Sequence, residues 1–153
     1  MAHWLFKSEP DTFGIDDLAA QPSQTDHWDG VRNYQARNFM RDRMQVGEQG
    51  FFYHSNTKEP GIVGIVEIAR AAYPDHTAFD PEDPHYDPGS DPNDPRWYMV
   101  DVRLVRRLER KITLSELKER AADLGDLPLV KKGNRLSIMP VPDDIWDYIL
   151  SLE

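Results

Sequence analysis

Four residues that lie close together in the sequence carry the side chains that proteins use to hold a nucleobase. Trp28, Arg32, Asn33 and Tyr34 fall within the stretch HWDGVRNYQARNFMRDR. An aromatic ring can stack on a base, an amide can read its polar edge, and a guanidinium can contact a base or a phosphate. A tryptophan ahead of a helix is also common in hydrophobic cores. These four therefore indicate a base-binding surface only together with other groups.

Polar residues at the ends of three apolar runs can supply those other groups. They are Lys7 and Ser8, Ser55 and Asn56, and Arg135 and Ser137. Residues that end neighbouring strands can meet at one edge of a sheet. We expect them to converge with the tryptophan-containing stretch on one rim.

Other kinds of site lack their sequence patterns. There is no GxGxxG, no GxxxxGK[ST] and no GxSxG, and the adjacent pair His54 and Ser55 would point to opposite faces of a strand. The chain has no cysteine, and its five histidines show no HxH or HExxH pairing. We predict no catalytic residue, no cofactor and no metal.

The charge of the chain is unevenly distributed. A formal net charge of −9 counts against a nucleic-acid partner, but seven acids and no Lys or Arg lie between Asp75 and Asp94. Basic residues cluster at 32–43, 103–111 and 131–135. We expect a surface with basic islands that can contact a few phosphates, and an acidic loop at 74–95 that stays at the surface. That loop holds six of the twelve prolines and lacks the spacing of a calcium loop, so it should bind no specific metal.

Hydrophobic periodicity predicts five strands and several short helices. The strands are expected at 3–8, 49–55, 61–69, 97–108 and 135–139, and the helices at 15–20, 36–44, from 113 onward and at 143–152. Thr113 and Glu116 form the best helix start, a capping box. Strands and helices that do not alternate regularly indicate an α+β domain around a curved mixed sheet or small barrel.

Length and composition favour one folded domain spanning residues 1–153. The chain is 39% apolar, has 153 residues and contains four Trp, which suffices for one core but is cramped for two. No apolar segment approaches the length of a membrane span, and none resembles a signal peptide. We expect neither secretion nor membrane insertion, and the absence of cysteine fits a cytoplasmic location.

Several motifs together resemble the EVE domain family, a branch of the PUA-like fold related to YTH and ASCH domains and to the eukaryotic thymocyte nuclear protein. The motifs are WLFKSEP (4–10), WDGVRNYQARNFM (28–40), YHSN (53–56), GIVGIVEI (61–68), YDP (86–88), Trp97 and RLSIMPV (135–141). They cover nearly the whole chain. The resemblance implies a PUA-like mixed β-barrel with peripheral short helices. It also implies non-enzymatic binding of a modified base, such as a modified cytosine, in DNA or RNA.

Carried onto this sequence, the resemblance implies one aromatic and polar pocket. Its expected members are Lys7, Ser8, Trp28, Arg32, Asn33, Tyr34, Ser55, Asn56, Trp97, Arg135, Ser137 and Pro140. Trp28 and Trp97 would sandwich the base, and Asn33 and Ser55 would read its edge. Lys7, Arg32 and Arg135 would meet phosphate or an oxidised substituent. The chain departs in one respect from what is expected of a nucleic-acid reader: the 75–95 loop is acidic and would repel a nucleic-acid backbone.

Two other hypotheses for the function are compatible with the sequence. An ASCH-like hydrolase of modified nucleosides would use Lys7 as a base with Glu9 or Glu67 beside it, since a desolvated lysine can act as a base near neutral pH. A protein-interaction module would use the acidic loop.

Overall fold

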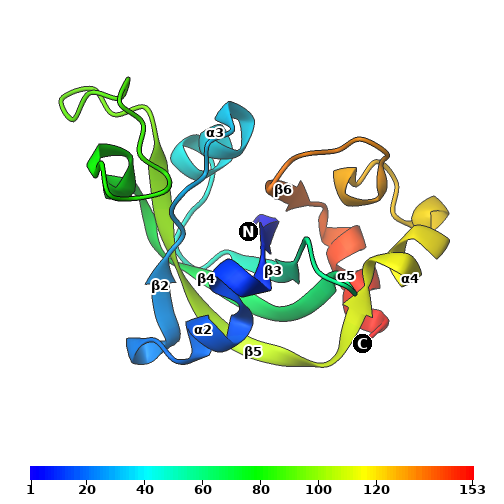
Figure 1. Cartoon of the computed structure of the whole chain (residues 1–153). Helices are drawn as coiled ribbons and strands as arrows, with labels where there is room; N and C mark the ends of the chain where they lie inside the picture. Colours follow the sequence, from blue (N-terminus) through cyan, green and yellow to red (C-terminus); the bar gives the residue numbers. More distant parts are fainter.

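The computed structural model covers residues 1–153 and is built around one strongly bent sheet of six strands (Figure 1). The strands are β1 (His3–Ser8), β2 (Thr25–His27), β3 (Gln49–His54), β4 (Gly61–Pro74), β5 (Tyr98–Thr113) and β6 (Ile138–Val141). They lie in the order β2-β5-β4-β3-β1-β6, with β1 parallel to β3 and every other pair antiparallel. The predicted α+β class is confirmed.

The sheet is open, so the predicted barrel is not confirmed. A barrel requires its two outermost strands to pair with each other. Here β2 is three residues long and pairs only with β5, while β6 is four residues long and pairs only with β1. Periodicity predicts strands, but it does not show whether the two edges meet.

The central strands are buried on both faces. In β1, Trp4 and Phe6 belong to one hydrophobic cluster while Leu5 belongs to another, and in β3 the cluster of Phe52 differs from that of its neighbour Phe51. A strand with two covered faces reads as a continuous apolar run rather than an alternating one. This explains why both strands were evident from sequence.

Short helices cover the two faces. They are α1 (Pro10–Phe13), α2 (Ile15–Ala19), α3 (Tyr34–Asp42), α4 (Leu114–Glu119) and α5 (Asp143–Ser151), with 3₁₀ turns η1 (Pro22–Gln24), η2 (His76–Phe79), η3 (Ala121–Asp123) and η4 (Pro128–Val130). Residues of α2 and α3 pack into the first cluster, and residues of α4 and α5 into the second. Thr113 caps α4 by accepting a hydrogen bond from the Glu116 amide. The predicted capping box is formed only in this half, because the Glu116 carboxylate accepts from Arg110 instead. No helix is long and apolar enough to cross a membrane.

Some predicted elements differ in extent. Strands β4 and β5 each run five residues further than predicted, β6 begins three residues later, and β2 was not predicted because Thr25–His27 contains no apolar residue. The acidic loop was expected to lie wholly at the surface, and its later part does. Its start does not, because Asp75 is 0% exposed and Thr77 is also buried.

Candidate functional site

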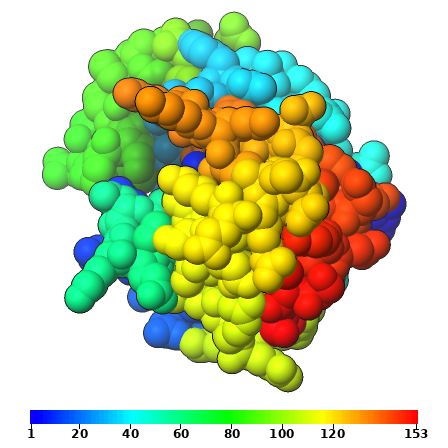
Figure 2. Space-filling view, turned by 90° about the vertical axis from the view of Figure 1, so that its right-hand side faces the viewer, coloured from blue at the N-terminus to red at the C-terminus, as the bar shows by residue number.

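A cavity of about 480 Å³ opens beside the end of β1. Figure 2 shows the hollow between the 80–95 loop and the 131–137 segment, with N-terminal residues at its bottom. Its lining comprises Lys7, Ser8, Glu9, Thr12, Phe13, Asp26, His27, Trp28, Asp29, Gly30, Val31, Arg32, Asp83, Pro84, His85 and Ser137. Five of the predicted site residues therefore share one cavity: Lys7, Ser8, Trp28, Arg32 and Ser137.

Trp28 forms an aromatic part of this lining. Its ring lies 5.1 Å from Phe6, 5.4 Å from Phe52 and 6.2 Å from Phe13, centroid to centroid, and all three contacts are edge-to-face. The side chain is only 7% exposed, so the same indole belongs to the first hydrophobic cluster and to the cavity wall. These three ring contacts restrict the orientation of the indole.

The end of β1 supplies polar groups next to the indole. The Lys7 amide donates to the Ser137 carbonyl at 2.8 Å, which joins two sides of the cavity through the backbone. Burial lowers the pKa of the Lys7 ammonium, which lies 5.9 Å from the centre of the Tyr53 ring. The Ser8 hydroxyl donates to the Phe13 carbonyl at 2.7 Å, so only its oxygen lone pairs can face a ligand.

Arg32 uses its side-chain hydrogen bonds within the protein, where they connect segments that border the cavity. Its five N–H groups donate to the carbonyls of Val31 and His85, to the Asp75 carboxylate and to the Thr77 hydroxyl, at 2.7–3.2 Å. Burial alone would raise the pKa of Asp75, but hydrogen bonds from Thr77, Gly30 and Arg32 hold it below its usual value. The predicted contact of Arg32 with phosphate is not what the structure shows, because no donor of its guanidinium is free.

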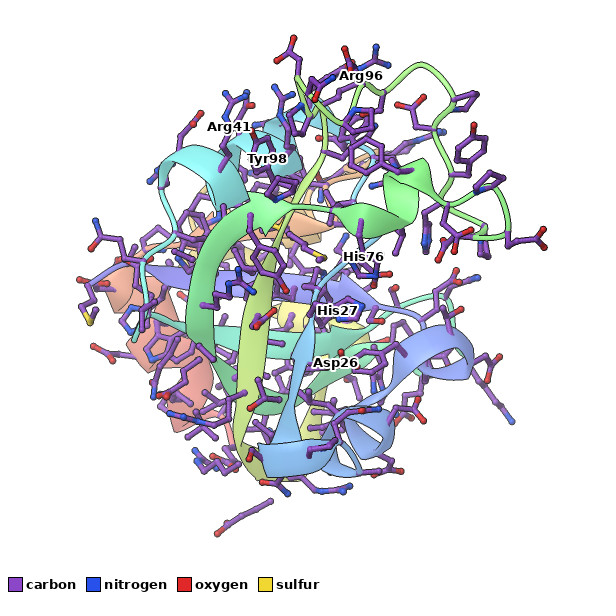
Figure 3. The ribbon with its side chains drawn as sticks, turned by 90° about the vertical axis from the view of Figure 1, so that its left-hand side faces the viewer. Asp26, His27, Arg41, His76, Arg96 and Tyr98 are labelled. Atoms are coloured by element: carbon purple, nitrogen blue, oxygen red, sulfur yellow. The ribbon has the colours of Figure 1, made fainter.

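Acids and histidines form the rest of the rim. Asp29, Asp83 and His85 place one ligand atom each within 4.8 Å of one another, a spacing that can hold a metal ion. His27 lines the cavity, and its ring meets that of His76, outside the lining, edge to face with centroids 5.2 Å apart. Figure 3 labels both histidines. The absence of a specific metal stays a prediction.

Three predicted residues lie together but outside the cavity. The Asn33 side chain caps α3 by accepting from the Ala36 amide at 3.0 Å. Tyr34 stacks on Trp97 with centroids 4.9 Å apart, and the Trp97 indole donates to the Asp87 carboxylate at 2.7 Å. The predicted sandwich of a base between Trp28 and Trp97 is therefore wrong, because Trp97 packs against the 75–95 loop rather than facing the cavity.

Four other predicted residues border the site or lie elsewhere. Ser55 contacts Ser8 only through its backbone amide, and the Asn56 amide donates to the Glu9 carboxylate at 2.7 Å. Arg135 is exposed on the 131–137 segment, two residues before Ser137. Pro140 lines a different cavity, beside Arg43. The predicted convergence of Asn33, Ser55 and Trp97 with Trp28 in one concave site is not found.

Sequence reasoning missed most of the acidic lining. Asp29 follows Trp28 directly in the sequence WDG, and that adjacency was a usable signal. Asp83 and His85 lie more than fifty residues further along in a loop without periodicity, so their approach to Asp29 had no signal in the sequence. Of the acids proposed for a hydrolase, Glu9 lines the cavity, whereas Glu67 forms an ion pair with Arg103 on the sheet.

Comparisons with known proteins agree with the sequence motifs. The model of the EVE domain matches residues 2–152. Thymocyte nuclear protein 1 of Gallus gallus is 54% identical over 166 residues, which cover 99% of this chain and 68% of that protein.

Solved structures show the same relationship. The crystal structure of human THYN1 in complex with DNA containing 5-methylcytosine matches with a TM-score of 0.91 and 50% identity, over 99% of this chain and 97% of the other. The YTH domain of Zygosaccharomyces rouxii MRB1, in complex with N6-methyladenosine RNA, matches with a TM-score of 0.56 at 15% identity, over 99% and 83% of the two chains. That likeness shows a shared fold alone.

Proposed function

Because this chain belongs to the EVE domain family, we propose that it binds one modified nucleobase of a nucleic acid in the cavity beside Trp28, without transforming it. The observation that carries the proposal is a base-sized cavity with an aromatic wall in a chain 50% identical to a protein solved with 5-methylcytosine DNA. The first ligand to test is 5-methylcytosine in DNA, with the same base in RNA as the second.

The aromatic wall supplies the main binding contribution. Stacking of a base on an aromatic side chain contributes about 1–3 kcal/mol. Trp28 is held by Phe6, Phe13 and Phe52, so little side-chain entropy is lost when a base packs against it.

A base must leave its stack to reach this wall, and that step sets the requirement for selectivity. Extrusion from a duplex costs a few kcal/mol. A modified base must therefore gain contacts that its unmodified parent lacks. The cavity offers Lys7 and Ser137 near its base-stacking wall for such contacts.

Phosphate contacts are expected to be few. Three exposed basic groups, Lys131, Lys132 and Arg135, lie on the same segment as the lining residue Ser137, while the 75–95 loop is acidic. About two to four neutralised phosphates correspond to a slope of log affinity against log salt no steeper than about −4 on duplex DNA.

The test is a titration of matched oligonucleotides with cytosine or 5-methylcytosine at one position, at several salt concentrations. Trp28→Leu keeps an apolar side chain in the core but removes the stacking face, so it should weaken binding of the modified oligonucleotide about tenfold. Thermal melting of the variant checks that it is folded. Tyr34→Ala is the matched control, since Tyr34 stacks outside the cavity, and it should leave the ratio of the two affinities unchanged.

Equal binding of both oligonucleotides, with a steep salt slope and no effect of Trp28→Leu, would identify a weak electrostatic binder and refute the proposal.

One observation favours a hydrolase as the second candidate. Burial lowers the pKa of Lys7, as a general base requires, and Glu9 lines the same cavity. Incubation with a panel of modified nucleosides, followed by mass spectrometry, distinguishes the two functions, because a reader yields no new product.

A further inference from the structure

We infer that the cavity sorts modified bases by charge: it admits a neutral base with an exocyclic amino group and rejects the same base when it carries a carboxylate. This inference rests on the proposed function and names the class of base that the cavity selects. It reverses the expectation from sequence that Lys7 and Arg32 would attract an oxidised, anionic substituent.

Carboxylates outnumber cations in the lining. The lining holds four acids and two side chains of the Lys and Arg type, Lys7 and Arg32. The acids are Glu9, Asp26, Asp29 and Asp83. They come from the N-cap of α1 (Glu9), from β2 (Asp26), from the segment after β2 (Asp29) and from the 75–95 loop (Asp83). Their meeting is therefore a product of the fold rather than of a local acidic run.

Arg32 does not compensate for these acids. Its guanidinium forms an ion pair with Asp75 at 3.1 Å, and Asp75 is 0% exposed. Its remaining donors are used by Thr77 and by backbone carbonyls. The charge of Arg32 is thus neutralised by an acid that does not line the cavity, and a ligand finds no free donor on it.

Lys7 is the one remaining cation, and burial weakens it. Desolvation disfavours the charged ammonium, as the lowered pKa of Lys7 indicates. Its Nζ lies over the Tyr53 ring. One weakened ammonium cannot balance four carboxylates.

Two of the four acids, Asp29 and Asp83, have only a histidine as ion-pair partner. Asp29 has His27 as its ion-pair partner, at 3.9 Å, and Asp83 has His85, at 3.3 Å. A histidine carries a full charge only when it is protonated. The two carboxylates are about one quarter to one third exposed, so water screens them only partly.

This arrangement matches the hydrogen-bonding character of an aminated base. An exocyclic amino group, such as N4 of cytosine, donates hydrogen bonds, and carboxylates are acceptors. A carboxylate added to the same base would be confined with like charges in a partly desolvated space, where repulsion exceeds its value in water.

The experiment compares three oligonucleotides that differ at one base: cytosine, 5-methylcytosine and 5-carboxylcytosine. They are titrated against the wild-type protein near neutral pH at one salt concentration. We expect the carboxylated oligonucleotide to bind at least about tenfold more weakly than the methylated one. Asp29→Asn should reduce the difference in affinity between the methylated and the carboxylated oligonucleotide (the affinity gap) several-fold. Asp83→Asn is a second variant with the same expected effect, and its amide oxygen can still accept the hydrogen bond from the His85 amide.

Asp91→Asn is the matched control. The Asp91→Asn variant removes the same unit of charge as Asp29→Asn or Asp83→Asn, and Asp91 lies in the same loop as Asp83, but Asp91 is exposed and lies outside the cavity. This variant should leave the gap unchanged. If it narrows the gap as much as Asp29→Asn does, the effect arises from the overall charge of the protein and the inference is wrong.

Two further outcomes separate the inference from the proposed function. If the methylated oligonucleotide binds more tightly than the unmodified one but the carboxylated one binds equally well, sorting by charge is refuted and base reading stands. If all three bind equally, both are refuted.

Discussion

The two segments that border the cavity are held in place by different means. The start of the 75–95 loop is fixed by a buried acid, since Asp75 accepts hydrogen bonds from Gly30, Arg32 and Thr77 at 2.6–3.1 Å. The 131–137 segment has turn-type backbone contacts, an exposed ion pair between Lys131 and Asp126 at 3.8 Å, and the link from Ser137 to β1.

This difference in anchoring indicates that the two segments have different roles. The 75–95 loop (the acidic side) is anchored at its buried start and contributes Asp83 and His85 to the cavity lining, whereas Lys131, Lys132 and Arg135 are exposed on the other segment (the basic side). In the proposed function, this exposed segment is the one that meets a nucleic-acid backbone. A rigid segment can discriminate among bases, because it cannot move away from a group that repels it.

The largest expected effect comes from the buried acid. Asp75→Asn leaves the Arg32 guanidinium without its counter-ion and turns an amide N–H toward other donors, so we expect a loss of about 3 kcal/mol in the free energy of unfolding. Arg135→Ala, on the basic side, should change it by less than about 0.5 kcal/mol. Urea denaturation measures both. Similar losses would show that the two segments are equally anchored.

A matched pair of glycines gives the second test. Gly30 and Gly133 have nearly the same φ, 77° and 78°, in the left-handed region. A Cβ on Gly133 meets nothing within 4 Å, so Gly133→Ala should cost only the backbone strain of about 1 kcal/mol. A Cβ on Gly30 would lie 2.6 Å from the His85 ring, so Gly30→Ala should displace that ring and cost somewhat more than Gly133→Ala. Equal losses in urea denaturation would contradict the close packing of the acidic side.

Low pH should reduce the free energy of unfolding through Asp75, which anchors the same side of the cavity. The pKa of Asp75 is lowered in the folded protein, so its contribution to stability is complete above its ordinary value of 3.8 and is lost as the pH falls through the lower folded-state value. Unfolding free energies measured between about pH 5 and pH 2 should therefore fall more steeply for wild type than for Asp75→Asn. Parallel curves would mean that Asp75 contributes nothing in this range.

The smallest effect is expected for the basic side. Arg135→Ala should reduce the slope of log affinity against log salt by about one if Arg135 contacts a phosphate, and should leave the preference for 5-methylcytosine intact. Titrations at three or more salt concentrations measure the slope. A changed base preference would place Arg135 in recognition instead.

The central strands β1 and β3 could be predicted because their residues are buried on both sides. Runs such as Trp4 to Phe6 have no other stable placement, so β1 and β3 follow from the sequence. Closure of the sheet could not be predicted, because it depends on where two short edge strands lie in space. The helix start at Thr113 is a local feature, and it was predicted correctly.

The candidate site was predictable only in part, because the same residue type serves more than one purpose. Asn33 has the chemistry of a base reader, yet its amide caps a helix, and Trp97 has the chemistry of a stacking wall, yet it stacks on Tyr34. Arg32 resembles a phosphate ligand, yet its donors are used within the protein. Only the partners formed on folding distinguish these roles.

The pairing of β6 with β1 sets the order in which the cavity can be assembled. The hydrogen bond from Lys7 to Ser137 and the ladder that follows it join segments separated by nearly the whole length of the chain. Contacts between such distant segments form slowly, since the connecting chain loses much entropy before they stabilise it. During synthesis on a ribosome, one edge of β1 would stay unpaired until β6, the last strand, has been made. Only then would Ser137 complete the cavity.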